Sequence, residues 1–184
     1  MPDRFSHPET KQFFQYWNSL PKSGFVPDRA DFDPLAIHKI MPRILMVEYF
    51  SPEDVVFRMV GTGITEDIGF DPTKRSYLSL LEDSAFGAFR SASDAIFSTP
   101  CGGHFLVTAQ SAKGYLVDFD VLDLPMTNRA ANSNIIVAHL AQVCVRGMVP
   151  MGTFRIKEIQ SAGWIDIGAG VPATPIALSQ GPGA

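Results

Sequence analysis

The stretch HFLVTAQSAKGYLVDFDVLDL, residues 104–124, decides the fold. Its second half alternates in polarity: every second residue from 115 to 121 is apolar or aromatic, whereas Asp118 and Asp120 occupy intervening positions. This period of two is typical of an antiparallel sheet with one buried and one solvated face. Because Ala112-Lys113-Gly114 forms a tight turn in the middle of the stretch, the two halves are predicted to form a hairpin.

Further strands are expected on both sides of this hairpin. Segments rich in apolar residues and bounded by turn residues predict strands at 44–50, 55–60, 104–111, 115–124 and 135–140, with a further strand-like stretch at 154–167. Helices are expected at 8–20, 34–39, 64–68 and 85–98, the second with Asp33 as its N-cap and Pro34 as its first residue. This order predicts an α+β fold, with a five-stranded antiparallel sheet and helices on one face. A hollow between the helices and the concave sheet face is a natural place for a small molecule.

The N-terminal helix is amphipathic. Phe13, Phe14, Trp17 and Leu20 recur at the spacing of one helix face. This aromatic face must pack either on the core of its own domain or on a second copy of the chain. We predict an interface at Phe13, Phe14 and Trp17, and a homodimer.

The 184 residues suffice for one domain with a proper core. We divide the chain into an N-terminal helical extension (1–40), a core (41–145) and a C-terminal extension (146–184). From about residue 168, the Gly, Pro and Ala content predicts a flexible tail.

The charge balance argues against nucleic acid as a partner. The chain has 15 Lys and Arg against 19 Asp and Glu, a net charge of −4, with no dense basic run. No apolar stretch approaches the roughly 20 residues that span a bilayer, and the first residues lack a hydrophobic signal core. These features predict a cytoplasmic protein without a membrane span. The only two cysteines, Cys101 and Cys144, are far apart in sequence and are read as free thiols.

Several motifs together resemble the PAS superfamily, and more narrowly an alphaproteobacterial family of stand-alone, uncharacterised PAS-like proteins. The residues that carry the resemblance lie within residues 12–142: Trp17 with Leu20-Pro21 and Gly24, Pro27-Asp28-Arg29-Ala30-Asp31-Phe32-Asp33-Pro34, Met41-Pro42-Arg43-Ile44, Phe57-Arg58-Met59-Val60-Gly61-Thr62, and Gly69-Phe70-Asp71-Pro72-Thr73-Lys74-Arg75. Lys74 stands where a glycine is expected and Phe70 where an arginine is common. The resemblance implies a sensory or protein-interaction module with no agreed ligand.

Two chemistries known in PAS domains are not expected here. Flavin-binding photosensors carry a cysteine in the segment comparable to residues 69–75, which has none. Haem-binding members use a histidine in or near the long helix, here 85–98, which has none. We therefore expect neither covalent flavin nor haem as a cofactor. His104 and His139, on predicted strands, are candidate pocket residues without the paired spacing of metal ligands.

The predicted ligand is small and either apolar or amphipathic, and its binding would change contact with a partner such as a histidine kinase. The predicted apolar lining comprises Phe57, Ile68, Leu78, Phe89, Phe105, Phe119 and Ile136. Polar residues that could orient the ligand are Arg75, Tyr77, His104 and Tyr115.

Two alternatives stay open. A small α+β cavity enzyme of the isomerase or dehydratase kind would need an acid on the inward sheet face. We place Asp118 and Asp120 on the solvent side, find no inward Asp or Glu, and find neither a catalytic constellation nor a metal site. The other alternative is a ligand-free dimerisation adaptor with a filled core.

Overall fold

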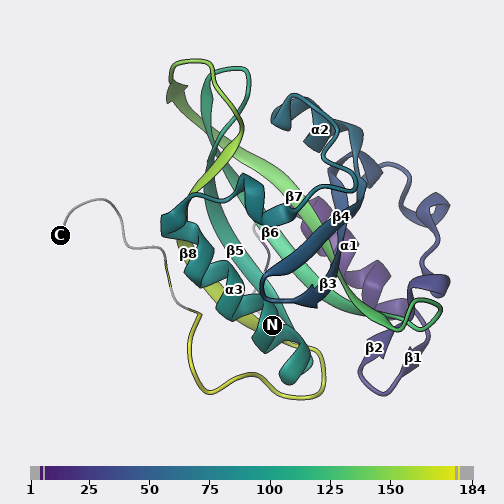
Figure 1. Cartoon of the computed structure of the whole chain (residues 1–184). Coiled ribbons are helices and arrows are strands. Elements are labelled where there is room, and N and C mark those ends of the chain that lie inside the picture. The colour runs from purple at the N-terminus through teal and green to yellow at the C-terminus, as the bar shows by residue number, and fades with distance from the viewer. Residues whose placement is uncertain (1–4, 6, 177, 179–184) are drawn as a thin grey trace.

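A six-stranded antiparallel sheet organises the chain in the computed structural model, which describes residues 5, 7–176 and 178 (Figure 1). Its strands are β3 (Ile44–Ser51), β4 (Asp54–Val60), β5 (Cys101–Gln110), β6 (Tyr115–Asn128), β7 (Ser133–Met148) and β8 (Arg155–Asp166). They lie in the order β4-β3-β7-β6-β5-β8, with every neighbouring pair antiparallel. A separate pair, β1 (Lys22–Ser23) and β2 (Val26–Pro27), forms a small second sheet. The predicted α+β class and antiparallel sheet are confirmed, but the main sheet has six strands rather than five.

The sixth strand comes from the C-terminal extension. β8 pairs with β5 along its length, from Cys101 opposite Asp166 to Gln110 opposite Arg155. The following segment folds back: the Trp164 indole N–H donates to the Thr174 carbonyl at 2.9 Å, and Ile176 is buried. Strand β8 of the C-terminal extension therefore belongs to the main sheet, and the segment after it packs back on the domain. Of the predicted flexible tail, residues 177 and 179–184 lie outside the described residues.

The helices cover both faces of the sheet. α1 (Pro8–Ser19) lies on one face; α2 (Thr62–Ile68), α3 (Asp83–Ser98) and the 3-10 turn η4 (Tyr77–Leu80) lie toward the other (Figure 1). Three more 3-10 turns, η1 (Arg29–Asp31), η2 (Pro34–Ile37) and η3 (Met41–Arg43), lead from α1 into β3. At η2 the predicted cap is confirmed, because the Asp33 carboxylate accepts from the Leu35 N–H at 2.9 Å.

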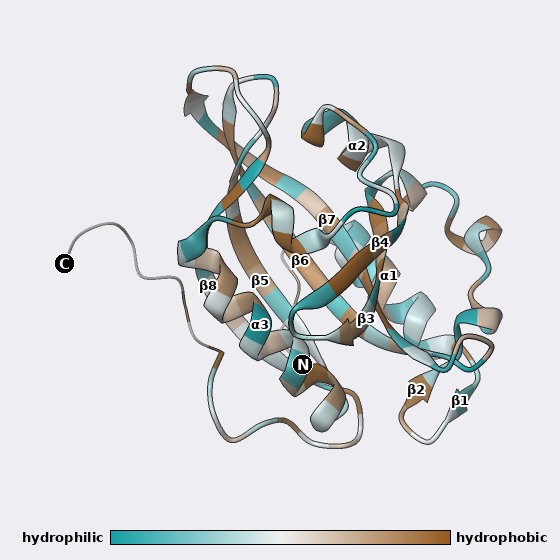
Figure 2. Cartoon of the chain, viewed as in Figure 1, coloured by the Kyte–Doolittle hydropathy of each residue, from teal (hydrophilic) through white to brown (hydrophobic). Residues whose placement is uncertain are grey.

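The two sheet faces carry two separate cores. The inner core, under α2, η4 and α3, includes Val47 and Phe119, whereas the outer core, under α1, includes Met46 and Leu122. Residues adjacent in a strand thus face opposite cores, as the pleat requires. Hydrophobic residues run along the middle of the sheet strands in Figure 2.

α1 supplies aromatic residues to the outer core. Phe13 and Trp17 are fully buried. The Trp17 indole N–H donates to the Pro125 carbonyl at 3.1 Å, and the Phe13 ring stacks on His139 with centroids 5.9 Å apart. Phe13 and Trp17 therefore pack on their own domain and are not exposed for the predicted interface between chains. Phe14 is half-buried against the ring of Phe5.

The carboxylates predicted to face solvent are also buried. Asp120 accepts from Thr10 of α1 at 3.5 Å and lies 2.8 Å from the His104 ring nitrogen. Asp118 accepts from the Thr108 hydroxyl and from the side-chain amide of Gln160 in β8, each at 2.8 Å. The prediction that this face is solvated is wrong, because both carboxylates are buried and accept hydrogen bonds from neighbouring side chains.

No helix among the described residues has the length and hydropathy to cross a membrane. Both cysteines are free thiols; Cys101 is buried and Cys144 is exposed.

Candidate functional site

A cavity lies between the inner face of the sheet and the layer formed by α2, η4 and α3. It encloses about 60 Å³, and a single water molecule needs roughly 10–15 Å³ of such space. It therefore has room for a few waters or a slender hydrocarbon. Its wall is formed by Leu45, Val47, Phe57, Ile64, Ile68, Tyr77, Leu80, Leu81, Phe89, Phe105, Val107, Ala109, Phe119, Val121, Asp123, Ile136, Ala138, Leu140, Phe154, Ile156 and Ile159.

The sheet side of the wall follows from the alternation of the strands. Phe119 pairs with Val107 of β5, and Val121 pairs with Phe105, so successive inward residues of both strands meet under the helices. On β7, Ile136 and Ala138 are inward, whereas Val137 between them belongs to the outer core.

The helical side of the wall is held by backbone hydrogen bonds and ring contacts. The Phe57 N–H donates to the Arg75 carbonyl at 3.0 Å, and the Lys74 N–H donates to the Phe57 carbonyl at 2.8 Å. These bonds fix the segment before η4 against β4. The ring of Tyr77 then stacks on Phe89 with centroids 4.4 Å apart and contacts the ring of Phe57 at 5.3 Å.

The structure brings seven of the residues predicted from the sequence together on this wall. They are Phe57, Ile68, Tyr77, Phe89, Phe105, Phe119 and Ile136. These positions lie on inward strand faces or on the helical segments above them.

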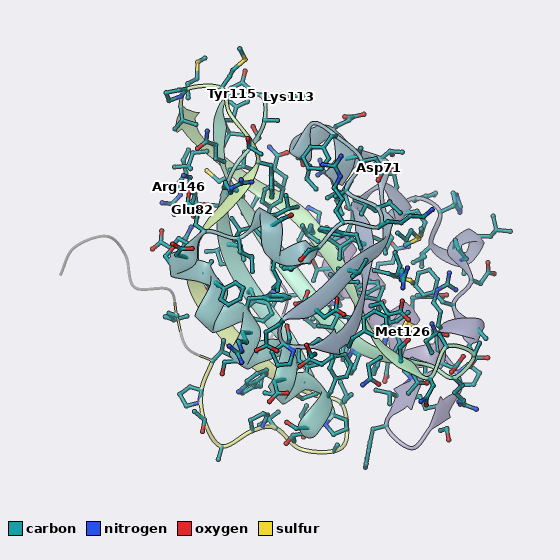
Figure 3. All side chains as sticks on the ribbon, viewed as in Figure 1. Asp71, Glu82, Lys113, Tyr115, Met126 and Arg146 are labelled. Atoms are coloured by element: carbon teal, nitrogen blue, oxygen red, sulfur yellow. The ribbon has the colours of Figure 1, made fainter. Side chains whose placement is uncertain are left out.

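The other four predicted residues do not line the cavity. Leu78 packs against the inner core without reaching the cavity. Arg75 is exposed, with its guanidinium 4.7 Å from the centre of the Phe70 ring. His104 is on the outer face of β5, paired with Asp120. Tyr115 is 40% exposed and lies next to the Lys113 turn, at the far end of the hairpin (Figure 3).

The sequence analysis missed a carboxyl group on the wall. Asp123 is 9% exposed, lines the cavity, and pairs in the sheet with Gly103 on one side and Ala138 on the other. The statement that no acid lies on the inward face is therefore wrong. Residue 123 lies within the predicted strand 115–124, so following the alternation of residues 117, 119 and 121 for one more step would have found it.

Burial dominates the electrostatics of this carboxyl. It raises the pKa of Asp123 to about 7, against a smaller opposing effect of His104. Burial, reinforced by the charge of Asp123, also raises the pKa of the Tyr77 hydroxyl. Within the part of the chain that the structure describes, neither side chain makes a hydrogen bond. The cavity thus contains two polar groups free to meet a ligand.

A cluster of polar side chains lies on the opposite face of the sheet, under α1. His139 is fully buried between Thr10, whose hydroxyl is 3.2 Å from Nδ1, and Glu9, whose carboxylate is 3.8 Å from Nε2. Burial lowers the pKa of His139 to about 4. Because His139 follows Ala138 in β7, this cluster and the cavity share one strand.

A comparison with protein families places this geometry in context. A family model described as "PAS domain" matches residues 5–141, well over half of the chain. The match begins before α1 and ends within β7, so it includes most of the cavity wall. No curated protein matches the chain.

Proposed function

The chain belongs to the PAS domain family, and we propose that it is a sensory module that binds a small apolar ligand in the cavity beneath α2, η4 and α3. The observation that carries the proposal is the cavity itself, enclosed almost entirely by hydrocarbon side chains. Protein interiors are packed closely enough that voids larger than a water molecule are few. An apolar void of this size under a layer of short helices suits a small hydrophobic molecule.

Part of the wall retains room to adjust to a ligand. Most wall residues are buried, but Tyr77, Leu81, Val121, Leu140 and Ile156 are only half-buried. Rearranging half-buried side chains costs less packing than rearranging buried ones. We therefore expect the cavity to enlarge on this side when a ligand enters.

Strand β7 provides a route from the ligand to the surface helix α1. Ile136 and Ala138 line the cavity, whereas the alternate residues Val137 and His139 face the outer core under α1. A ligand that favours one position of β7 therefore also favours one position of α1, in proportion to its differential affinity for the two states. We propose that this shift alters contact with a signalling partner, such as a histidine kinase. A homodimer and a cytoplasmic setting belong to the same proposal.

Filling the cavity should abolish binding. We expect 1-heptanol, a slender apolar probe, to bind the wild-type protein in a saturable manner in ligand-observed NMR. Ala138→Leu, which extends a side chain into the cavity, should weaken this binding at least tenfold. Ala36→Leu makes the same substitution at an exposed position of η2 and should leave binding unchanged. Equal binding by all three proteins would refute the cavity as the site.

Asp123 favours one other candidate, the cavity enzyme, because a carboxyl with a raised pKa in an apolar site can transfer protons. Incubating the protein with 2-heptanone in deuterium oxide separates the two functions. A sensor leaves the ketone unlabelled, whereas a proton-transfer enzyme exchanges its α-hydrogens. The third reading, a ligand-free adaptor, predicts that no apolar probe enters the cavity.

A further inference from the structure

The polar groups of the cavity wall are few and lie on two elements. Of the described residues that line it, only Asp123 of β6 and Tyr77 of η4 have polar side chains. All the others are aliphatic or phenylalanine. No lysine, arginine or histidine is among them. An apolar ligand with one polar group would therefore find its only side-chain partners at these two residues.

The residues paired with Asp123 in the sheet offer its carboxyl no hydrogen-bonding side chain. Its partner on β5 is Gly103, which has no side chain, and its partner on β7 is Ala138, which has a single methyl group. A Cβ atom at Gly103 would come within 2.6 Å of the Phe105 ring. The ring thus occupies the position that a side chain at residue 103 would need, and no neighbouring side chain on either strand reaches out to hydrogen-bond Asp123.

Asp123 is 9% exposed, and its carboxyl oxygens are not among the fully buried atoms that lack a partner, a class that holds only His139 Nε2 in the described residues. Since Asp123 lines the cavity, we take its remaining accessible surface to face that space, where a ligand can supply the hydrogen bonds that the protein does not. We propose that Asp123 anchors the ligand, and that the ligand is an apolar amine whose protonated nitrogen binds this carboxylate beside the Tyr77 hydroxyl. The proposal deepens the sensory function and rests on it.

The charges around the site favour a cation over an anion. The titratable groups that act on Asp123 are Tyr77, from η4, and His104, from the opposite face of β5. His104 is already paired with Asp120. A ligand carboxylate would lie beside a carboxyl with no positive side chain on the described wall. Folding has already removed the Asp123 carboxyl from water. When an ammonium group binds to it, only the amine must therefore lose its water shell.

Three probes with the same chain length test this proposal: 1-heptylamine, 1-heptanol and heptanoate. At pH 8, where the amine is charged and Asp123 is largely ionised, we expect heptylamine to bind wild-type protein about tenfold more tightly than heptanol. Heptanoate should bind more weakly than either. In Asp123→Asn, which preserves the shape of the side chain, the tenfold preference for the amine should disappear while heptanol still binds.

The outcomes distinguish this proposal from the one on which it rests. If no probe binds, the sensory cavity itself is refuted. If heptanol binds but wild-type protein shows no preference for the amine, or the preference survives in Asp123→Asn, only the amine proposal is overturned. Should the variant fail to fold, the wild-type protein at pH 5 provides the same test. There Asp123 is protonated, so the preference should shrink; an undiminished preference would overturn the proposal.

Discussion

Replacing Trp17 with alanine is expected to lower the free energy of unfolding by about 3–5 kcal/mol. The side chain is fully buried in the outer core, and its indole N–H satisfies the carbonyl of Pro125 at 3.1 Å. The substitution therefore leaves both a large void and an unpaired buried carbonyl. Urea denaturation followed by circular dichroism measures the loss.

Gln15→Ala is the matched control, because Gln15 is exposed on the same helix. It should change stability by no more than about 0.5 kcal/mol. If Trp17→Ala instead preserves stability and abolishes self-association, α1 is an interface between chains, and its packing on the sheet described here is wrong.

The second large effect concerns the pH dependence of stability set by Asp123. Its pKa is raised from 3.8 to about 7 on folding, so the protonated acid is favoured in the folded protein. This preference for the protonated acid stabilises the folded protein fully below pH 3.8, and the stabilisation is lost as the pH rises toward 7. Asp123→Asn cannot ionise and should not show this loss.

We therefore expect Asp123→Asn to gain stability relative to wild type between pH 5 and pH 8, by about 3 kcal/mol at 1.36 kcal/mol per pKa unit. Comparing the two proteins at each pH cancels the contribution of His139 and other groups that both share. Chemical denaturation at the two pH values measures the gain. A stability difference that is the same at pH 5 and pH 8 would mean that Asp123 keeps an ordinary pKa and does not face an apolar cavity.

Local sequence signals predicted much of the fold. The aromatic spacing of α1, the Asp33-Pro34 start of η2 and the hairpin around Gly114 all appear where they were expected. Each depends on residues close together in the chain, which fix hydrogen bonds or the burial of one face. The strand β8 was only a weak expectation, because its polar and apolar residues alternate less regularly.

The errors concern what covers each face of the sheet. Alternation shows that Asp118 and Asp120 share a face, but not that Thr108 and Thr10 bring hydrogen bonds to that face. Those bonds depend on β5 and α1, and no pattern within β6 reveals them. Likewise, Arg75 was predicted to orient a ligand, but its side chain is exposed and its guanidinium lies over the ring of Phe70.

Asp123 was missed for a different reason. The alternation was followed only as far as Val121, although the predicted strand reached residue 124 and β6 runs on to Asn128. In its cavity, the carboxyl has a pKa raised by burial and lies among apolar side chains. Acids perturbed in this way tend to occur at functional sites, and this one is the basis of the proposed ligand class.

The cavity as a binding site is tested most directly by methyl NMR of isoleucine-, leucine- and valine-labelled protein during titration with 1-heptanol. The inner methyl groups of Ile64, Ile136 and Leu140 line the cavity, whereas those of Leu122 and Val137 lie in the outer core. The account predicts saturable shifts at the inner methyl groups, with the largest changes there and much smaller ones across the sheet. Shifts of equal size on both faces, or none at the inner methyl groups, would contradict it.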